Sequence, residues 1–302
     1  MKKTIILSFL AMTVATACHK EDELTPEEDF TISHFLPQAG DTSEEAQIRR
    51  QFYQTENSFL LFNDTIRHDL LGTGPDGKEY FKTETIDIGY SVGDNYEQSG
   101  SYSYEYLNTV AEKQAAAKFI QEELIPHLGT KDLRPFSWMA AKKVIYTAFG
   151  SDTEKTSVKG ERCIAVALGD ITSADMNKKE LSSQIMQSLL GSLIESKEEE
   201  LENFYAVNNS IYDTRFTNPD FTEEYAWEEV KSKGFIKLAV NDWTGAILLV
   251  WYPTKKQDLN AFVELALGKT EAEVNSMYAG YPVIIQKYQL MKQVIESVGY
   301  KF

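Results

Sequence analysis

The chain has 302 residues, of which 42% are hydrophobic, and a formal net charge of −16 at pH 7. This hydrophobic share is enough for a packed core and excludes a disordered protein. The acidic charge excludes binding through nucleic-acid phosphates or anionic lipid headgroups. A chain of this length forms one large domain or two small ones.

The N-terminus has the pattern of a secretory signal. Lys2 and Lys3 precede the apolar run Ile5–Val14, and small residues then lead into Cys18. The apolar run is too short to cross a hydrocarbon layer of about 30 Å. We predict a signal peptide over residues 1–17 and lipidation of Cys18, although Ala15 stands where bacterial lipoprotein signals usually have Leu. The alternative is an ordinary cleaved signal that ends near a cysteine.

The residues after Cys18 indicate the destination. Lys20 is followed by three acidic residues, which resembles the export signal of Bacteroidetes surface lipoproteins. We expect an outer-membrane lipoprotein exposed on the cell surface, held by its lipid and an acidic tether over residues 18–42. The alternative is a generic acidic tether in the periplasm. Removal of residues 1–17 takes away two lysines and lowers the net charge from −16 to −18.

Hydrophobic periodicity predicts the elements that follow. The longest apolar run, Gly245–Tyr252, is too short to span a membrane and is predicted to be a buried strand. The pattern is α+β, helix-rich with a small sheet. In chain order we predict helix Ser43–Phe62, strand Thr83–Val92, helix Tyr104–Leu128, strands Lys142–Phe149 and Glu161–Leu168, and helices Asn177–Tyr205, Thr222–Lys233, Asp258–Leu267 and Thr270–Val298, the last broken near Gly280.

Residues 71–78 are predicted to form a turn. Gly72, Gly74 and Gly77 have the Gly-x-Gly-x-x-Gly spacing of dinucleotide-binding loops. That motif needs a strand before it and a helix that begins in it. Neither is predicted here, so the sequence argues against a dinucleotide site.

The second cysteine is predicted to be structural. If Cys18 carries lipid, Cys163 has no partner for an intrachain disulfide. Cys163 lies within the apolar run Arg162–Leu168. We therefore expect a buried thiol and not a nucleophile.

An apolar strand, a short loop and a long helix form the framework of zinc metallopeptidases. In those enzymes the helix carries His-Glu-x-x-His, whose two histidines share one face and whose Glu activates a metal-bound water. The histidines of this chain are His19, His34, His68 and His127. None lies on the predicted helix Asn177–Tyr205 and no two are four apart, so these residues do not assemble such a site.

The order of elements nevertheless resembles that of one family. The segments that carry the resemblance are a strand, a motif helix, a helix end, an acidic segment and a closing helix, found at 162–168, 185–194, 233–236, 260–264 and 284–302. They are similar to those of the Bacteroidetes zinc-metallohydrolase-like lipoproteins associated with substrate import. The resemblance covers residues 43–302 and is best after residue 160. It implies a single metallopeptidase-like (zincin-like) α+β domain over 43–302 with a small mixed sheet.

The resemblance also shows where this chain departs from the family. Gln187 and Gly191 stand at the positions of the two ligand histidines, and Ser188 stands at the position of the catalytic Glu. Glu264 is the one acidic match, and its alternative is a plain helix-surface carboxylate. Gln is a poor zinc ligand, Gly offers none, and Ser cannot replace a carboxylate as general base. The resemblance therefore implies a degenerate relative with no catalytic residue, no bound metal and no other cofactor.

Three functions follow from these observations. The first is a non-catalytic surface lipoprotein that serves an outer-membrane nutrient-import system, with a TonB-dependent transporter complex as partner and no nucleic acid. The second is an active zinc hydrolase that uses His68 or His127 with acids. The third is a glycan- or peptide-binding lipoprotein unrelated to peptidases, without a strand beside helix Asn177–Tyr205. Its binding surface would use aromatic residues of the C-terminal half, namely Tyr225, Trp227, Trp243, Trp251, Tyr252, Tyr278 and Tyr281.

Overall fold

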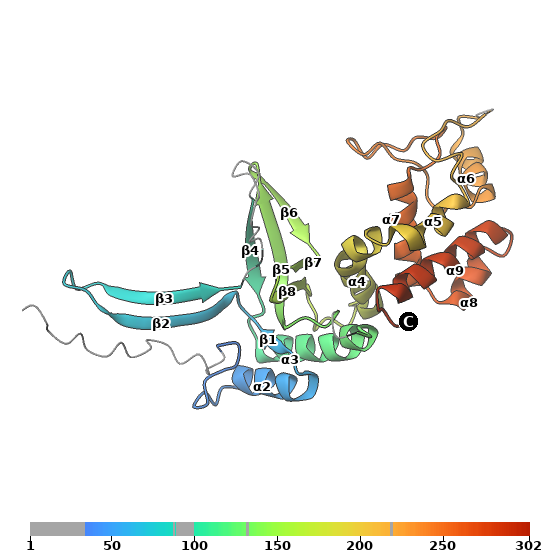
Figure 1. The fold of residues 1–302 in the computed structure, drawn as a ribbon. Helices are drawn as coiled ribbons and strands as arrows, with labels where there is room; N and C mark the ends of the chain where they lie inside the picture. Colours follow the sequence, from blue (N-terminus) through green and yellow to red (C-terminus); the bar gives the residue numbers. More distant parts are fainter. Residues whose placement is uncertain (1–33, 87, 89–99, 131–132, 218–219) are drawn as a thin grey trace, which may run out of the picture. The chain divides into compact units, whose positions relative to one another are not determined.

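The computed structural model describes residues 34–302, apart from 87, 89–99, 131–132 and 218–219 (Figure 1). The chain divides into two units, Met1–His34 and Phe35–Phe302. Every helix and strand of the described residues belongs to the second unit, which is α+β as predicted. The predicted signal peptide and Cys18 lie outside the described residues.

A mixed sheet is built around one long strand, β5. The first half of β5 pairs in parallel with β1 and β8, and its second half pairs antiparallel with β4 and β6. β7 lies antiparallel beside β8 at the end of the order β1-β5-β8-β7. The strands are β1 (Phe59–Leu61), β4 (Ser101–Tyr106), β5 (Ser137–Ala148), β6 (Ser151–Lys155), β7 (Ser157–Lys159) and β8 (Cys163–Ala167).

The parallel part of this sheet is buried on both faces. Its strands therefore read as continuous apolar runs without alternation. One face contributes Leu60, Trp138, Ala140, Ile164 and Val166 to the larger hydrophobic core, and the other contributes Leu61, Met139, Ala141, Cys163 and Ala165 to a second core. The predicted burial of Cys163 is confirmed, since its side chain is 1% exposed.

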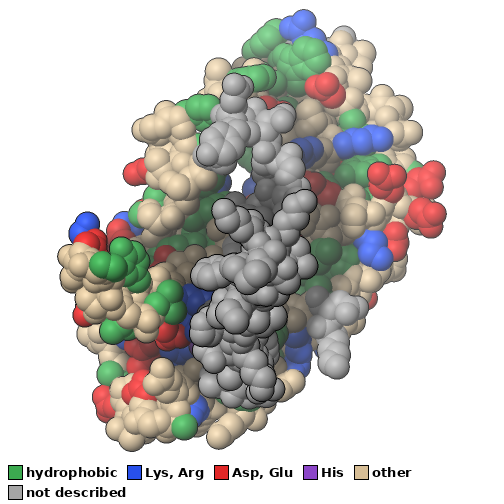
Figure 2. Space-filling view, turned by 60° about the vertical axis from the view of Figure 1, so that its left-hand side comes forward, with side chains coloured by type: hydrophobic (Ala, Val, Ile, Leu, Met, Phe, Trp, Pro, Cys, Tyr) green, Lys and Arg blue, Asp and Glu red, His purple; other side chains and the backbone are tan. Residues whose placement is uncertain are grey.

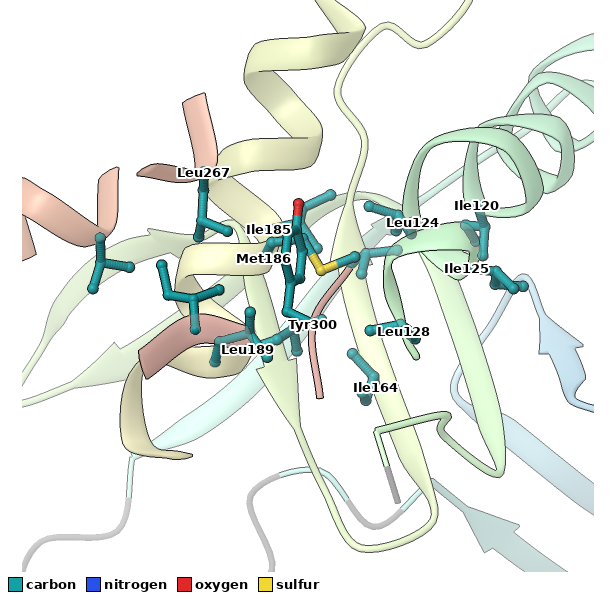
Figure 3. Packing of buried hydrophobic residues seen from close by; sticks show 14 of the residues in the cluster. Ile120, Leu124, Ile125, Leu128, Ile164, Ile185, Met186, Leu189, Leu267 and Tyr300 are labelled. Atoms are coloured by element: carbon teal, nitrogen blue, oxygen red, sulfur yellow. The ribbon is translucent and has the colours of Figure 1, made fainter. Parts of the chain in front are cut away.

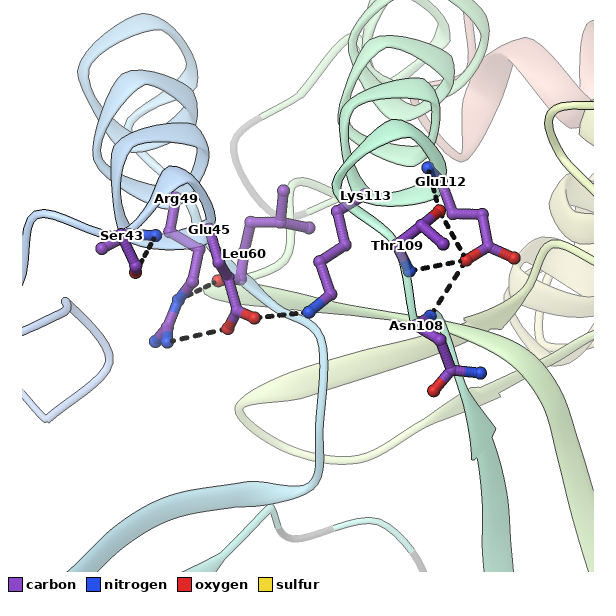
Figure 4. A network of polar contacts seen from close by, with 9 residues as sticks. Ser43, Glu45, Arg49, Leu60, Asn108, Thr109, Glu112 and Lys113 are labelled. Atoms are coloured by element: carbon purple, nitrogen blue, oxygen red, sulfur yellow. Dashed lines mark hydrogen bonds and ion pairs between the residues drawn. The ribbon is translucent and has the colours of Figure 1, made fainter.

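Two helices precede β5 and are joined by a polar network. They are α2 (Glu44–Glu56) and α3 (Val110–Phe119), and α3 continues as a π turn and a 3-10 turn to His127. Glu45 of α2 accepts a hydrogen bond of 2.6 Å from the Lys113 ammonium of α3 (Figure 4). The Arg49 guanidinium donates to the Leu60 carbonyl at 2.9 Å, which ties α2 to β1. This network fixes both helices to the start of the sheet.

The remaining helices follow β8 and pack around the larger core. Ile185, Met186 and Leu189 point from α4 into this core, where they meet Leu267 of α7 and Tyr300 near the C-terminus (Figure 3). None of the helices in the described part of the chain is long and apolar enough to cross a membrane. The helices are α4 (Lys178–Glu195), α5 (Glu198–Ala206), α6 (Glu223–Ser232), α7 (Lys255–Gly268), α8 (Glu271–Met277) and α9 (Pro282–Ser297).

The predicted glycine-rich turn connects a two-stranded hairpin. β2 (Thr65–Thr73) pairs antiparallel with β3 (Glu79–Thr85), and the Gly74 amide donates to the Lys78 carbonyl at 2.8 Å. Gly77 has φ of 81°, a conformation that favours glycine. The turn prediction is confirmed for residues 74–78, whereas residues 71–73 belong to β2, a strand before the turn that was not predicted.

Several predicted elements were wrong in extent or type; among them, the strand predicted over Lys142–Phe149 begins five residues earlier, as β5 at Ser137. The helix predicted over Ser43–Phe62 ends at Glu56, because Asn57 is left-handed and the next residues pair with β5. The helix predicted from Tyr104 starts at Val110, since the tyrosines before it belong to β4. The helix Asn177–Tyr205 is broken at Ser196 and Lys197 into α4 and α5. The run Gly245–Tyr252 is not a strand but a series of turns with isolated bridges.

Other predictions were confirmed or only partly covered. α6 begins after its N-cap Thr222 and is followed by Gly234 with φ of 90°, as predicted. The predicted break near Gly280 separates α8 from α9, which starts at Pro282. The strand predicted over Thr83–Val92 is described only to Thr85 as part of β3, and most of the rest lies outside the described residues.

Candidate functional site

The helix that the resemblance identifies as the motif helix is α4. Asn177 caps its N-terminus by accepting a hydrogen bond of 3.2 Å from the Glu180 amide. The apolar face of α4 is buried against the sheet and α7, as described above. Gln187, Ser188 and Gly191 lie outside this buried set, and Gln187 and Gly191 share one face because they are four residues apart.

The three positions have different surroundings. The Gln187 side chain is half-buried, and its amide nitrogen lies 3.4 Å from the Asn260 carbonyl of α7. The Ser188 hydroxyl donates to the Ser157 carbonyl of β7 at 3.2 Å. A Cβ added to Gly191 would meet no atom within 4 Å. The motif helix therefore lies beside a short antiparallel strand on one side and beside α7 on the other.

Gln187 and Glu264 line the same cleft, which has a volume of about 710 Å³. Glu264 comes from α7 and forms an ion pair with Lys237. Ser188 and Gly191 are not among the lining residues. The cleft lies between α4, α7 and α8, and its polar lining includes Asn177, Lys179, Glu180, Gln184, Gln187, Lys237, Glu264, Lys269 and Glu273.

Every carboxylate that lines this cleft already has a partner in the protein. Glu180 accepts a hydrogen bond of 3.0 Å from the side-chain amide of Asn177, and Glu264 forms an ion pair with Lys237. Glu273 closes a capping box, and hydrogen bonds from the Thr270 amide and hydroxyl, both 2.7 Å, lower the pKa of this carboxyl to about 2. These acids are therefore held as hydrogen-bond acceptors and ion pairs.

The donor set does not fit zinc. Zinc sites use imidazole, thiolate and carboxylate ligands, and the lining residues of this cleft include no His and no Cys. This cleft offers amides and carboxylates engaged by lysine or by a helix cap. Across the described ranges, no group of three or more His, Cys, Asp or Glu side chains is arranged to hold a metal ion. What the cleft can do chemically is form hydrogen bonds with a polar ligand, next to the half-buried phenol of Tyr278.

The two histidines considered for a hydrolase lie in separate elements with neutral partners. A ring nitrogen of His68 lies 2.8 Å from the Thr83 hydroxyl in the β2–β3 hairpin. A ring nitrogen of His127 lies 2.6 Å from the Lys301 carbonyl, and its ring stacks on Tyr300. Neither lines the cleft that holds Gln187 and Glu264.

Sequence reasoning missed a buried ionic cluster centred on Lys287 of α9. The Lys287 ammonium is fully buried and donates to Asp258 at 2.6 Å and to the Asn208 side chain at 2.8 Å. The Tyr212 hydroxyl donates to the same oxygen of Asp258 at 2.6 Å. The rings of Phe204, Phe235 and Phe262 surround the ammonium at 4.8, 4.7 and 4.6 Å.

Burial shifts the pKa of both partners toward the neutral forms. It lowers the pKa of Lys287 to about 8, and it raises the pKa of Asp258. The second oxygen of Asp258 has no hydrogen-bond partner in the part of the chain that the structure describes. Because the ammonium is 0% exposed, this cluster is closed to ligands and ties α7 and α9 together as a structural element. The signal in the sequence was a lysine within the apolar stripe of α9, between Ile284 and Met291.

Comparisons with known proteins identify no relative of this chain. No protein-family model matches it, and neither a curated protein nor a solved structure does so.

Proposed function

We propose that this chain is a non-catalytic lipoprotein with a metallopeptidase-like domain, exposed on the outer-membrane surface as a binding component of a nutrient-import system. The observation that carries the proposal is the composition of α4 at the positions of the motif. An amide, a hydroxyl and a glycine stand there, at Gln187, Ser188 and Gly191, and the facing acid Glu264 forms an ion pair with Lys237.

The arrangement of strands supports a zincin-like scaffold. The strand–loop–helix order that the family uses is present as β8, a loop and α4. The antiparallel strand β7 lies beside α4, because the Ser188 hydroxyl bonds to its Ser157 carbonyl. A glycan- or peptide-binding lipoprotein unrelated to peptidases was expected to have no strand beside this helix, so this contact favours the metallopeptidase-like alternative.

The anchoring part of the proposal rests on the N-terminal sequence. The signal over residues 1–17, Cys18 and the acids after Lys20 support lipidation and surface export. An accessory protein of this kind would bring its cleft to a TonB-dependent transporter complex. The cleft between α4, α7 and α8, with its paired charges and amides, would bind a polar ligand without transforming it.

Restoring the motif tests the scaffold directly. The triple variant Gln187→His, Ser188→Glu, Gly191→His places two imidazoles four residues apart, and a Cβ at position 191 meets no atom within 4 Å. We expect this variant to bind zinc at one ion per chain by isothermal titration. Glu264→Gln in the same background should weaken binding by about tenfold or more, if Glu264 supplies the third ligand.

A matched control separates geometry from composition. The variant Gln187→His, Ser188→Glu, Ser192→His carries the same new residues but places the imidazoles five apart, on different helix faces. It should bind zinc more weakly than the first triple variant, because it keeps no pair of imidazoles on one helix face. Equal zinc affinity of the two triple variants, or no zinc binding by either, would contradict the metallopeptidase-like placement of α4.

A further inference from the structure

One aromatic side chain is held almost entirely in solvent. Hydrophobic side chains reach the face shown in Figure 2 at separate places between charged ones, so exposure alone does not mark a site. Of the aromatic residues that the sequence offered for ligand stacking, Tyr252 is buried, Trp227 is half-buried and Trp251 is 37% exposed. Trp243 is 96% exposed. Burial of a tryptophan side chain removes about 150–250 Å² of surface from water, and the fold of this chain does not gain that stabilisation at Trp243.

The turn that carries Trp243 is fixed by its own hydrogen bonds. The side-chain oxygen of Asn241 accepts from the amides of Trp243 and Thr244, both at 3.0 Å. The Gly245 amide donates to the Asn241 carbonyl at 2.8 Å, and Gly245 has φ of 70°. The Asn241 amide donates to the Ala246 carbonyl at 2.8 Å and closes the turn. The side chain of Asn241 thus satisfies the backbone at the tip.

The turn is also anchored to the start of α7. The Gln257 side-chain amide donates to the Val240 carbonyl at 2.7 Å and to Asp242 at 2.8 Å. Gln257 is itself held by the capping box of Thr254. The backbone that presents Trp243 is therefore rigid, and a ligand would not have to order it on binding.

We propose that Trp243 is a stacking platform for an uncharged sugar ring. The flat apolar face of a pyranose matches an exposed indole face, and hydroxyls at the ring edge can bond to the polar residues of the turn. Within the turn itself, residues 240–247, Asp242 is the one charged residue, and its carboxylate argues against a phosphate, sulfate or other anionic ligand. The net negative charge of the whole chain also disfavours an anionic ligand.

The neighbours of Trp243 distinguish a sugar from a membrane or a protein partner. Asp242 directly precedes Trp243 in the chain, and moving its carboxylate into a bilayer is costly. The residues that dominate binding at protein–protein interfaces cluster in a desolvated patch. In the turn from Asn241 to Ile247, the large exposed apolar residues are Trp243 and Ile247 alone, and Ile247 is 52% exposed. Trp243 does not line the α4–α7–α8 cleft, so sugar binding at this turn is independent of the proposed function.

The test uses the full chain and a panel of uncharged oligosaccharides: maltoheptaose, cellohexaose, laminarihexaose, mannohexaose and xylohexaose. Binding is measured by isothermal titration and by tryptophan fluorescence. We expect at least one sugar to bind. Trp243→Ala should weaken that binding by about tenfold, which corresponds to about 1.4 kcal/mol, and Trp243→Phe should retain most of it.

Controls keep the outcome decisive. Phe149→Ala removes an aromatic ring that is 88% exposed at the β5–β6 turn and should leave sugar binding unchanged. Unchanged thermal unfolding and circular dichroism establish that Trp243→Ala is folded. Three results would overturn the inference: no sugar of the panel binds, Trp243→Ala binds as tightly as the unmodified chain, or Trp243 is required for binding to phosphatidylcholine vesicles and not to any sugar.

Discussion

The buried pair Lys287–Asp258 gives a stability prediction that can be worked from its geometry. Each partner is removed with little change of shape by Lys287→Met or Asp258→Asn, and the two are then combined. The ammonium and the carboxylate are 0% and 1% exposed and 2.6 Å apart. Removing one of them leaves the other charge buried with too few partners, which is the expensive case for an ion pair.

The expected magnitudes follow from this arrangement. At an effective dielectric constant of about 20, unit charges 2.6 Å apart attract by about 6 kcal/mol, which offsets only part of a desolvation cost of several kcal/mol per ion, in line with the lowered pKa of Lys287. Loss of one partner should therefore destabilise the fold by about 3–5 kcal/mol. Since domains are stable by about 5–15 kcal/mol, either single variant should be severely affected.

Urea unfolding of the four proteins measures the coupling in a double-mutant cycle. We expect the double variant to be more stable than the sum of the single losses predicts, by about 2 kcal/mol or more, because no uncompensated charge remains. Two results would refute the reasoning: single losses below about 1 kcal/mol, or losses that simply add.

Three further predictions use other features of the chain. The pKa of Lys287 is about 8 in the fold and about 10.4 when unfolded, so the unfolded state binds more protons between these values. The stability of the unmodified chain relative to Lys287→Met should thus rise from about pH 8 to pH 10, by about 2–3 kcal/mol in urea titrations, and a flat difference would argue against the shifted pKa. Gly191→Ala should stabilise the fold by about 0.5–1 kcal/mol in thermal melts, because nothing lies within 4 Å of the new Cβ in mid-helix; a loss of stability would show that the site is closed. Cys18→Ala should abolish incorporation of labelled palmitate and release the protein from membranes, whereas continued labelling would place the lipid elsewhere.

The elements that were predicted well from the sequence are marked by local residues at their ends. α6 has the N-cap Thr222 and a glycine just past its end, and α9 starts at Pro282. The helix prediction was wrong at β1. Phe59 and Leu60 continue the helical spacing of Phe52, but their pairing with β5 decides their conformation. That pairing is non-local, and no window around residue 60 contains it.

The same limit applies to the candidate site. Gln187 and Glu264 were singled out by resemblance alone, since no periodicity links two residues on different helices. Their common cleft depends on how α4 packs on α7. The cluster around Lys287 left a local trace, a lysine on an apolar helix face, but its partners Asn208 and Asp258 come from elsewhere in the chain.

Zinc analysis of the unmodified protein tests whether its domain lacks a metal site. The full chain, expressed with zinc in the medium and purified without chelators, is examined by plasma mass spectrometry and then titrated with zinc. A chain that keeps the strand–helix frame but not its imidazoles should contain far less than one zinc ion per molecule and take up none tightly. One firmly held zinc ion per molecule, released by Glu264→Gln, would contradict the absence of a metal site.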